Sequence, residues 1–262
     1  MTALYALLLA QTIGPVAPTP APPPRAAATP DGTEARYDRC VDLATSDPKA
    51  GEADATQWRA AGGGYFARQC LGIAYANQRR WLAAADEFAG AAGDAEVAHD
   101  SRAAHYWAQS GNARLAQGDP AKARSALDAA LATATLTGLQ RGEASFDRAR
   151  ALVLLGDLEG ARADLDRAQK LAGADPLVWL ASATLARRTR DLPRARADIA
   201  RAFELARDDA SVMLEIGNIA AASGDADGAQ GAWSEAVRLA PDSEAAAQAR
   251  AALKQFEDKP KQ

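Results

Sequence analysis

Residues that carry enzyme chemistry are scarce in this sequence. It has two histidines, His99 and His105, which lie six positions apart and would not share a helical face well. Its two cysteines, Cys40 and Cys70, are too far apart for a CxxC motif. The GxSxG, HExxH and Walker-type phosphate-loop patterns do not occur. We therefore expect a protein that is not an enzyme, with no catalytic residues, no metal site and no cofactor.

Blocks of a single charge are also missing. The chain has 30 Lys+Arg and 34 Asp+Glu residues, for a formal net charge of −4, and the two signs are interspersed. Asp147 lies beside Arg148 and near Arg150, a mixture that is typical of a solvated, ion-paired helix surface. Nucleic-acid binding favours a basic block, so we expect no nucleic-acid partner. After residue 15, no apolar run approaches the ~18–20 residues that a membrane span needs.

Aromatic residues make up only 6% of the chain, and alanine dominates its composition. No stretch alternates between apolar and polar residues for long enough to predict a β-strand. The composition therefore indicates an all-helical protein in which small residues lie where helices approach closely.

The N-terminus begins with an apolar run, MTALYALLLA, within residues 1–14. Its length is typical of the core of a secretory signal peptide, although the first basic residue is Arg25. The alternatives are a disordered apolar tail or an uncleaved N-terminal anchor. A signal predicts an exported, periplasmic protein, whereas a chain without one would be cytoplasmic.

Residues 15–33 are rich in proline, with the run PVAPTPAPPPRAAATP at Pro15–Pro30. Proline removes hydrogen-bond donors and holds the chain extended, so this segment is predicted to be a disordered, polyproline-like linker. The alternative is a ligand for a groove that binds proline-rich segments.

The two cysteines gain a meaning if the chain is exported. In an oxidising compartment, Cys40 and Cys70 are expected to form one disulfide. Closing a loop of about 30 residues would contribute about 3–4 kcal/mol on the chain-entropy model.

A period of 34 residues dominates the rest of the sequence. Residues 210–243 contain two apolar-periodic segments joined by a turn at Ser223–Asp225 and closed by Pro241. The layout recurs with a fixed period at 176–209 and 142–175, and with wider spacing at 104–137 and 65–98. The extra residues of the wider spacings fall near 93–101 and 135–142, where we expect a longer helix or loop. Such a pattern predicts stacked helix pairs.

The residues at fixed places in these units resemble the tetratricopeptide repeat. The last unit has Gly217 in its first helix, then Ala229, Trp233 and Ala236 in its second, and a closing Pro241. The resemblance covers residues 65–243, about two-thirds of the chain. It implies an all-α fold, a right-handed α-solenoid of about five helix pairs. Residues 34–64 would form an N-terminal helical cap, and residues 244–262 a C-terminal capping helix and tail.

The resemblance also implies a set of partner-binding residues. In tetratricopeptide proteins the first helix of each pair lines a concave groove, and fixed positions of that helix point into it. Asparagine there often holds the backbone of an extended peptide, and arginine would receive a carboxylate. The alternative is that these residues are merely exposed helix residues. The polar residues at these positions in this chain are Gln69, Asn112, Arg150, Thr184, Arg187 and Asn218.

The leading functional hypothesis is therefore a non-catalytic module that binds a partner protein or an extended peptide in the groove. The alternative is a structural or assembly subunit, either a homo-oligomer or a component of an envelope or secretion complex.

Overall fold

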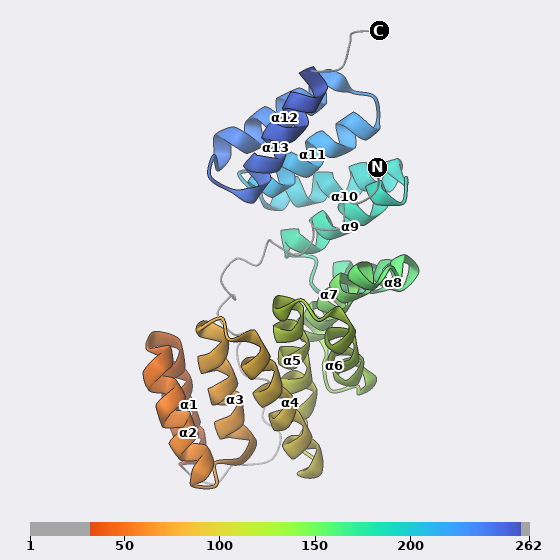
Figure 1. Cartoon of the computed structure of the whole chain (residues 1–262). Coiled ribbons are helices and arrows are strands. Elements are labelled where there is room, and N and C mark those ends of the chain that lie inside the picture. Colours follow the sequence, from red (N-terminus) through yellow and green to blue (C-terminus); the bar gives the residue numbers. More distant parts are fainter. Residues whose placement is uncertain (1–31, 258–262) are drawn as a thin grey trace. The chain divides into compact units, whose positions relative to one another are not determined.

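The computed structural model describes residues 32–257, and within that range every regular element is an α-helix (Figure 1). The prediction of an all-α fold is confirmed. The predicted signal peptide, all but the last two residues of the predicted linker and the last five residues of the chain lie outside the described residues. The chain divides into two compact units at Asp157–Leu158.

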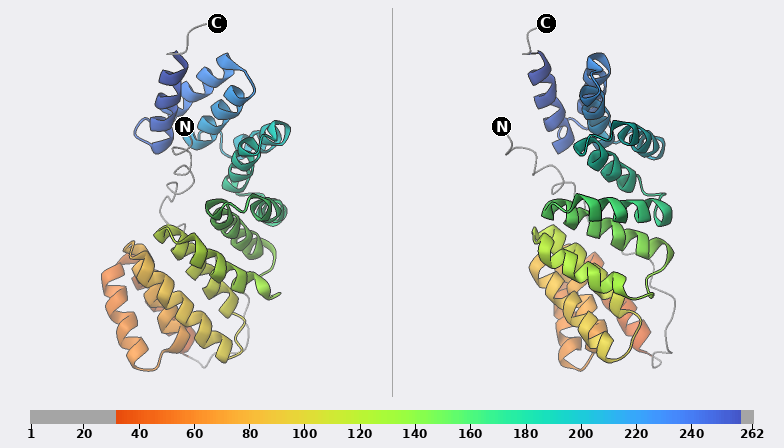
Figure 2. Two further views of the ribbon diagram at one scale, coloured as in Figure 1. Left: turned by 45° about the vertical axis from the view of Figure 1, so that its right-hand side comes forward. Right: turned by 90° about the vertical axis from the view of Figure 1, so that its right-hand side faces the viewer.

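The first unit is a series of helices joined by short turns, in which each helix packs against the next (Figures 1 and 2). Its first two helices span residues 33–60 and overlap the segment 34–64, whose role as a cap stays a prediction. The helices are α1 (Thr33–Ser46), α2 (Pro48–Ala60), α3 (Gly64–Asn77), α4 (Trp81–Val97), α5 (Ala103–Gln117), α6 (Pro120–Ala132) and α7 (Gly138–Leu155).

The second unit is also a series of helices, and its last helix packs on α11 and α12. Its helices are α8 (Leu158–Leu171), α9 (Pro176–Arg188), α10 (Leu192–Leu205), α11 (Ala210–Ala222), α12 (Ala226–Leu239) and α13 (Glu244–Glu257). We call the first helix of each repeat the A helix (α3, α5, α7, α9, α11) and the second the B helix.

Glycines in the A helices let the B helices approach closely. A Cβ atom added to Gly217 would lie 2.4 Å from Cδ1 of Trp233, and one added to Gly111 would lie 2.5 Å from Cγ of Leu127. Trp233 and Leu127 are 4% and 0% exposed, so they occupy the space that the missing Cβ atoms leave. The sequence pattern of a small residue facing a large one is therefore the packing contact within each of these pairs.

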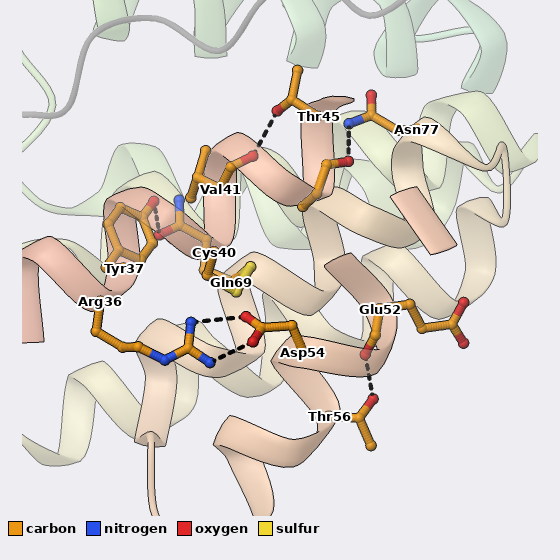
Figure 3. Close-up of a disulfide and its surroundings, with 12 residues drawn as sticks. Arg36, Tyr37, Cys40, Val41, Thr45, Glu52, Asp54, Thr56, Gln69 and Asn77 are labelled. Carbon is orange, nitrogen blue, oxygen red and sulfur yellow. Dashed lines mark hydrogen bonds and ion pairs between the residues drawn. A yellow bond between two sulfur atoms is a disulfide. The ribbon is translucent and has the colours of Figure 1, made fainter. Parts of the chain in front are cut away.

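A disulfide joins the cap to the first repeat (Figure 3). Cys40 on α1 and Cys70 on α3 have Cα atoms 6.1 Å apart, and both residues are 0% exposed. Near it, the Arg36 guanidinium donates to both oxygens of Asp54 at 2.7 and 2.9 Å, which ties α1 to α2. The cap is therefore held by a buried covalent bond as well as by polar contacts.

In the second, fourth and fifth repeats, the turn between the A and B helices has a left-handed residue followed by an aspartate cap. Gly118 and Gly224 have φ values of 85° and 81° there. In the fourth repeat the same place is taken by Arg190, with a φ of 64°. The next residue, Asp191, donates its backbone N–H to Ala186 O at 2.8 Å and caps α10 through Arg194 N. A side chain with a Cβ atom is strained in this conformation.

We expect Arg190→Gly to stabilise the second unit by about 0.5–1 kcal/mol, because relief of the strain exceeds the entropy that glycine adds to the unfolded chain. Urea unfolding would measure the change. The matched control is Arg196→Gly in the interior of α10, which should destabilise the unit by about 1 kcal/mol. Equal losses for both variants would show that the turn is not strained.

Candidate functional site

The predicted partner-binding residues all lie on A helices, and in each unit we call the surface formed by its A helices the A-helix face. Gln69 is buried, and the other five are half-buried. Gln69, Asn112 and Arg150 belong to α3, α5 and α7 of the first unit, and Thr184, Arg187 and Asn218 belong to α9 and α11 of the second.

Gln69 lies between helices and not on the surface that a partner contact requires. It is 4% exposed. Its Oε1 atom accepts a hydrogen bond from the Tyr37 hydroxyl at 2.7 Å, and its Nε2 atom donates to Oε1 of Gln109 at 3.0 Å. The amide thus links α3 to α1 and α5, an internal role that replaces the predicted contact with a partner.

Asn112 and Arg150 share one carboxylate in the first unit. Nδ2 of Asn112 donates to Oδ2 of Asp147 at 2.9 Å, and Nη1 of Arg150 donates to Oδ1 of the same residue at 2.9 Å. The Arg150 guanidinium also lies 5.8 Å from the centre of the Phe146 ring. Asp147 therefore accepts from both side chains, of which the sequence analysis assigned Asn112 to a partner's backbone and Arg150 to a partner's carboxylate.

The second unit repeats this arrangement with a different acid. Arg187 donates to both oxygens of Glu215, at 2.6 and 3.1 Å, and Nδ2 of Asn218 donates to Oε2 of Glu215 at 3.1 Å. Oδ1 of Asn218 accepts from the indole N–H of Trp233 at 3.1 Å. Glu215 is only 5% exposed, so Arg187 compensates a nearly buried charge. Thr184 lies half-buried on α9.

Sequence reasoning missed the acids that complete these two clusters. Asp147 lies three residues before Arg150, and Glu215 lies three residues before Asn218, so each acid is one helical turn from a predicted site residue. An acid three residues before a predicted site residue, on the same helical face, was the sequence signal that could have predicted these internal hydrogen bonds. The sequence analysis instead treated Asp147 as part of a solvated surface.

The second unit also has a cleft of about 440 Å³ on α8, α9 and α10. Its two guanidiniums are bonded within the protein. Arg162 donates to Ser182 Oγ at 2.7 Å, and Arg194 pairs with Asp166 and Asp198. Burial, and then the nearby Arg194, lower the pKa of Arg162. The cleft is lined by Leu158, Glu159, Arg162, Ala163, Asp166, Leu185, Thr189, Asp191 and Arg194.

One pair near this cleft has the residue types of hydrolytic chemistry. The Ser182 hydroxyl donates to Oδ2 of Asp198 at 2.5 Å. Ser182 is 0% exposed and is held from its other side by Arg162, so its hydroxyl is out of reach of a substrate. The pair is therefore a buried structural contact between α9 and α10.

Between residues 32 and 257, no group of three or more His, Cys, Asp and Glu residues is placed to hold a metal ion. Burial lowers the pKa of His105 to about 4, so this histidine is neutral near pH 7. None of the helices in that range is long and apolar enough to cross a membrane.

Several solved structures share this architecture. The pilF protein of Pseudomonas aeruginosa matches with a TM-score of 0.68 and 18% identity, over 85% of this chain and 100% of that one. PilW, a widely conserved type IV pilus biogenesis factor, matches with a TM-score of 0.70 and 17% identity, over 84% and 99%. YrrB, a tetratricopeptide protein with an unusual peptide-binding site, matches with a TM-score of 0.56 and 18% identity, over 75% and 96%.

The comparison with curated proteins gives no match. The tetratricopeptide repeat family model matches residues 109–176 and 180–244, which together make up half of the sequence. These two segments include the repeats in which the glycine-to-large-residue packing and the aspartate-capped turns were observed. The chain belongs to the tetratricopeptide repeat family.

Proposed function

We propose that this protein is a non-catalytic interaction module that binds a partner protein or an extended peptide on the A-helix faces of its units. The observation that carries this proposal is the arrangement of Asn112 around Asp147 and of Arg187 and Asn218 around Glu215. These polar side chains are half-buried and held in place by internal bonds, so a partner would not have to order them. Preorganisation of this kind favours binding.

The fold supports a scaffold function. Tetratricopeptide stacks are generally non-catalytic, and the Ser182–Asp198 pair of this chain is buried. A partner is therefore expected to be bound and positioned, with no chemical change.

Position-specific photo-crosslinking in cells tests the binding face. Benzoylphenylalanine would replace Phe146 on α7 and Thr184 on α9, both half-buried on A helices. The controls are Ser125 on α6 and Ala200 on α10, both exposed on B helices. We expect the same partner to be captured from the two A-helix positions and from neither control. Capture from the B-helix positions alone would show that the A-helix face is not the binding surface.

Asn112 is the better target for mutation, because Asn218 has a second role. Asn218→Ala would remove bonds to both Glu215 and Trp233, so it would weaken the fold as well as any binding. Asn112→Ala removes one bond, to Asp147. We therefore expect Asn112→Ala to reduce crosslinking at position 146 with little change in the unfolding midpoint.

A second candidate function is that of an assembly subunit. It is favoured by the likeness to pilF and to the pilus biogenesis factor PilW, whose chains are covered almost completely. Light scattering on the purified protein would reveal a homo-oligomer. In the crosslinking experiment, this function predicts that the captured partner is a second copy of the chain.

Export is supported by the buried Cys40–Cys70 disulfide, since such bonds persist in oxidising compartments. The mature protein would then be periplasmic. Its intact mass should lack the signal segment, roughly the first 10–20 residues, and one hydrogen for each bridged sulfur. A full-length mass with two free thiols would contradict both inferences.

A further inference from the structure

A hydrogen-bond relay connects the cap to the middle of the first unit. The Tyr37 hydroxyl on α1 donates to Oε1 of Gln69 on α3 at 2.7 Å, as Figure 3 shows. Nε2 of Gln69 then donates to Oε1 of Gln109 on α5 at 3.0 Å. Two amide groups and one phenol therefore form a line across three helices.

The direction of this relay follows from the phenol proton. Between residues 32 and 257, the only acceptor that the Tyr37 hydroxyl reaches is Oε1 of Gln69. Burial raises the pKa of Tyr37, so the proton stays on the phenol throughout the physiological range. With its oxygen engaged by Tyr37, Gln69 presents its Nε2 atom to Gln109. Gln109 must then turn its oxygen inward and its NH2 group away from Gln69.

The outward groups of α5 form a donor–acceptor pair. In the part of the chain that the structure describes, no acceptor is bonded to Nε2 of Gln109 and no donor is bonded to Oδ1 of Asn112. Both residues are half-buried. Nε2 of Gln109 and Oδ1 of Asn112 are not among the buried side-chain atoms that lack a partner, so both atoms are accessible to a ligand. Side chains three positions apart on a helix have Cβ atoms about 5–6 Å apart.

We propose that Tyr37 is a positioning residue that fixes the Gln109 amide. Held in this orientation, the Gln109 N–H and the Asn112 carbonyl oxygen bind one carbonyl and one N–H along the edge of an extended polypeptide. The ligand class follows from this donor and acceptor on Gln109 and Asn112. An extended backbone presents alternating C=O and N–H groups along one edge, which are the complementary acceptor and donor. The polypeptide part of this inference rests on the proposed function, and the relay itself does not.

The relay also gives the cap a role at the binding face. Tyr37 lies one helical turn before Cys40, whose bridge to Cys70 places α1 against α3. The Gln69 amide, one residue before Cys70, is oriented from the same helix pair. The disulfide-linked cap thus determines whether the Gln109 side chain on α5 presents its NH2 group or its oxygen to a partner.

Side-chain amide exchange measured by NMR on the ¹⁵N-labelled mature protein tests the relay. In the unmodified protein, the Gln69 NH2 group should be protected from exchange and the Gln109 NH2 group should exchange freely. Tyr37→Phe keeps the ring but removes the proton that sets the direction. Without the hydrogen bond from Tyr37, the Gln69 amide is no longer held in one orientation, and the Gln109 NH2 group can donate to it in turn. We therefore expect the protection of the Gln69 NH2 group to fall at least about fivefold and that of the Gln109 NH2 group to rise. The control, Tyr75→Phe, removes a hydroxyl of α3 outside the relay.

Binding is tested with N-methylacetamide, which carries one carbonyl and one N–H. It should shift the Gln109 and Asn112 side-chain amide signals in the unmodified protein. Gln109→Glu keeps an oxygen for Gln69 but replaces the outward NH2 with oxygen, and it should weaken the response of the Asn112 side-chain amide about tenfold. Gln230→Glu, an exposed residue of the second unit, controls for the added charge.

Two results would overturn the proposal. One is protection of the Gln109 NH2 group in the unmodified protein, or amide exchange that Tyr37→Phe leaves unchanged. The other is an N-methylacetamide response that Gln109→Glu and Gln230→Glu alter equally. Neither readout needs the cellular partner, so a failed crosslinking experiment would reject the proposed function and leave the relay standing.

Discussion

Replacing Ala229 with aspartate is expected to unfold α11, α12 and α13 while the first unit stays folded. Ala229 is 0% exposed and packs in one cluster with Trp233, Leu214 and Ala249. A carboxylate placed there without a partner costs several kcal/mol, which is comparable with the total stability of a small domain. In repeat proteins each layer is coupled mainly to its neighbours, so the damage should stay local.

Hydrogen exchange followed by mass spectrometry would locate the damage. Amides of α11–α13 should lose protection, and those of α3–α6 should keep it. The neighbouring Gln230 is exposed, so Gln230→Asp introduces the same group without burying it and should leave exchange nearly unchanged. Loss of protection spread evenly over both units would contradict coupling between neighbours.

Removing the disulfide by the double substitution Cys40→Ala and Cys70→Ala should cost the first unit about 3–4 kcal/mol. The bridge closes a loop with a sequence separation of 30, and constraining the unfolded chain over such a loop accounts for about that amount. The loss should concentrate in α1 and α2, which contribute few buried side chains of their own, mainly Cys40, Ala44 and Ala55.

Urea unfolding with and without a reductant would measure this effect. Under unfolding conditions the reductant should lower the midpoint of the unmodified protein and leave that of the double variant unchanged. A double variant as stable as the unmodified protein would show that polar contacts such as Arg36–Asp54 hold the cap on their own.

The all-helical fold and the repeat family were predictable because their signals are local. Apolar periodicity, aspartate caps and turn glycines each act over a few residues. The sequence analysis placed the extra residues of the two wider repeat spacings near 93–101 and 135–142. In the structure α4 continues to Val97 and α7 begins at Gly138, so a helix end lies in each of these segments. A missing turn glycine did not stop the fourth repeat from forming, because Arg190 accepts the same backbone conformation at a cost in strain.

The hydrogen-bond partners at the site were not predictable in the same way. Asn112 meets Asp147 across 35 positions, and Arg187 meets Glu215 across 28. The helical period identifies which face a residue lies on, but it does not identify which acid of the next A helix reaches it. The predicted availability of Arg187 depended on that missing information, whereas Asp147 lies three residues before Arg150 on the same helix and was a local signal.

The internal acids also affect how a partner would approach the protein. Arg150 and Arg187 are each paired with a carboxylate of the same chain, so these cations exert little net attraction at a distance. Long-range attraction raises association rates above about 10⁵–10⁶ M⁻¹s⁻¹ and makes them fall with added salt. A partner docking beside these paired charges would arrive without such steering. Its encounter rate would change little with ionic strength, and selectivity would arise in how long the complex lasts.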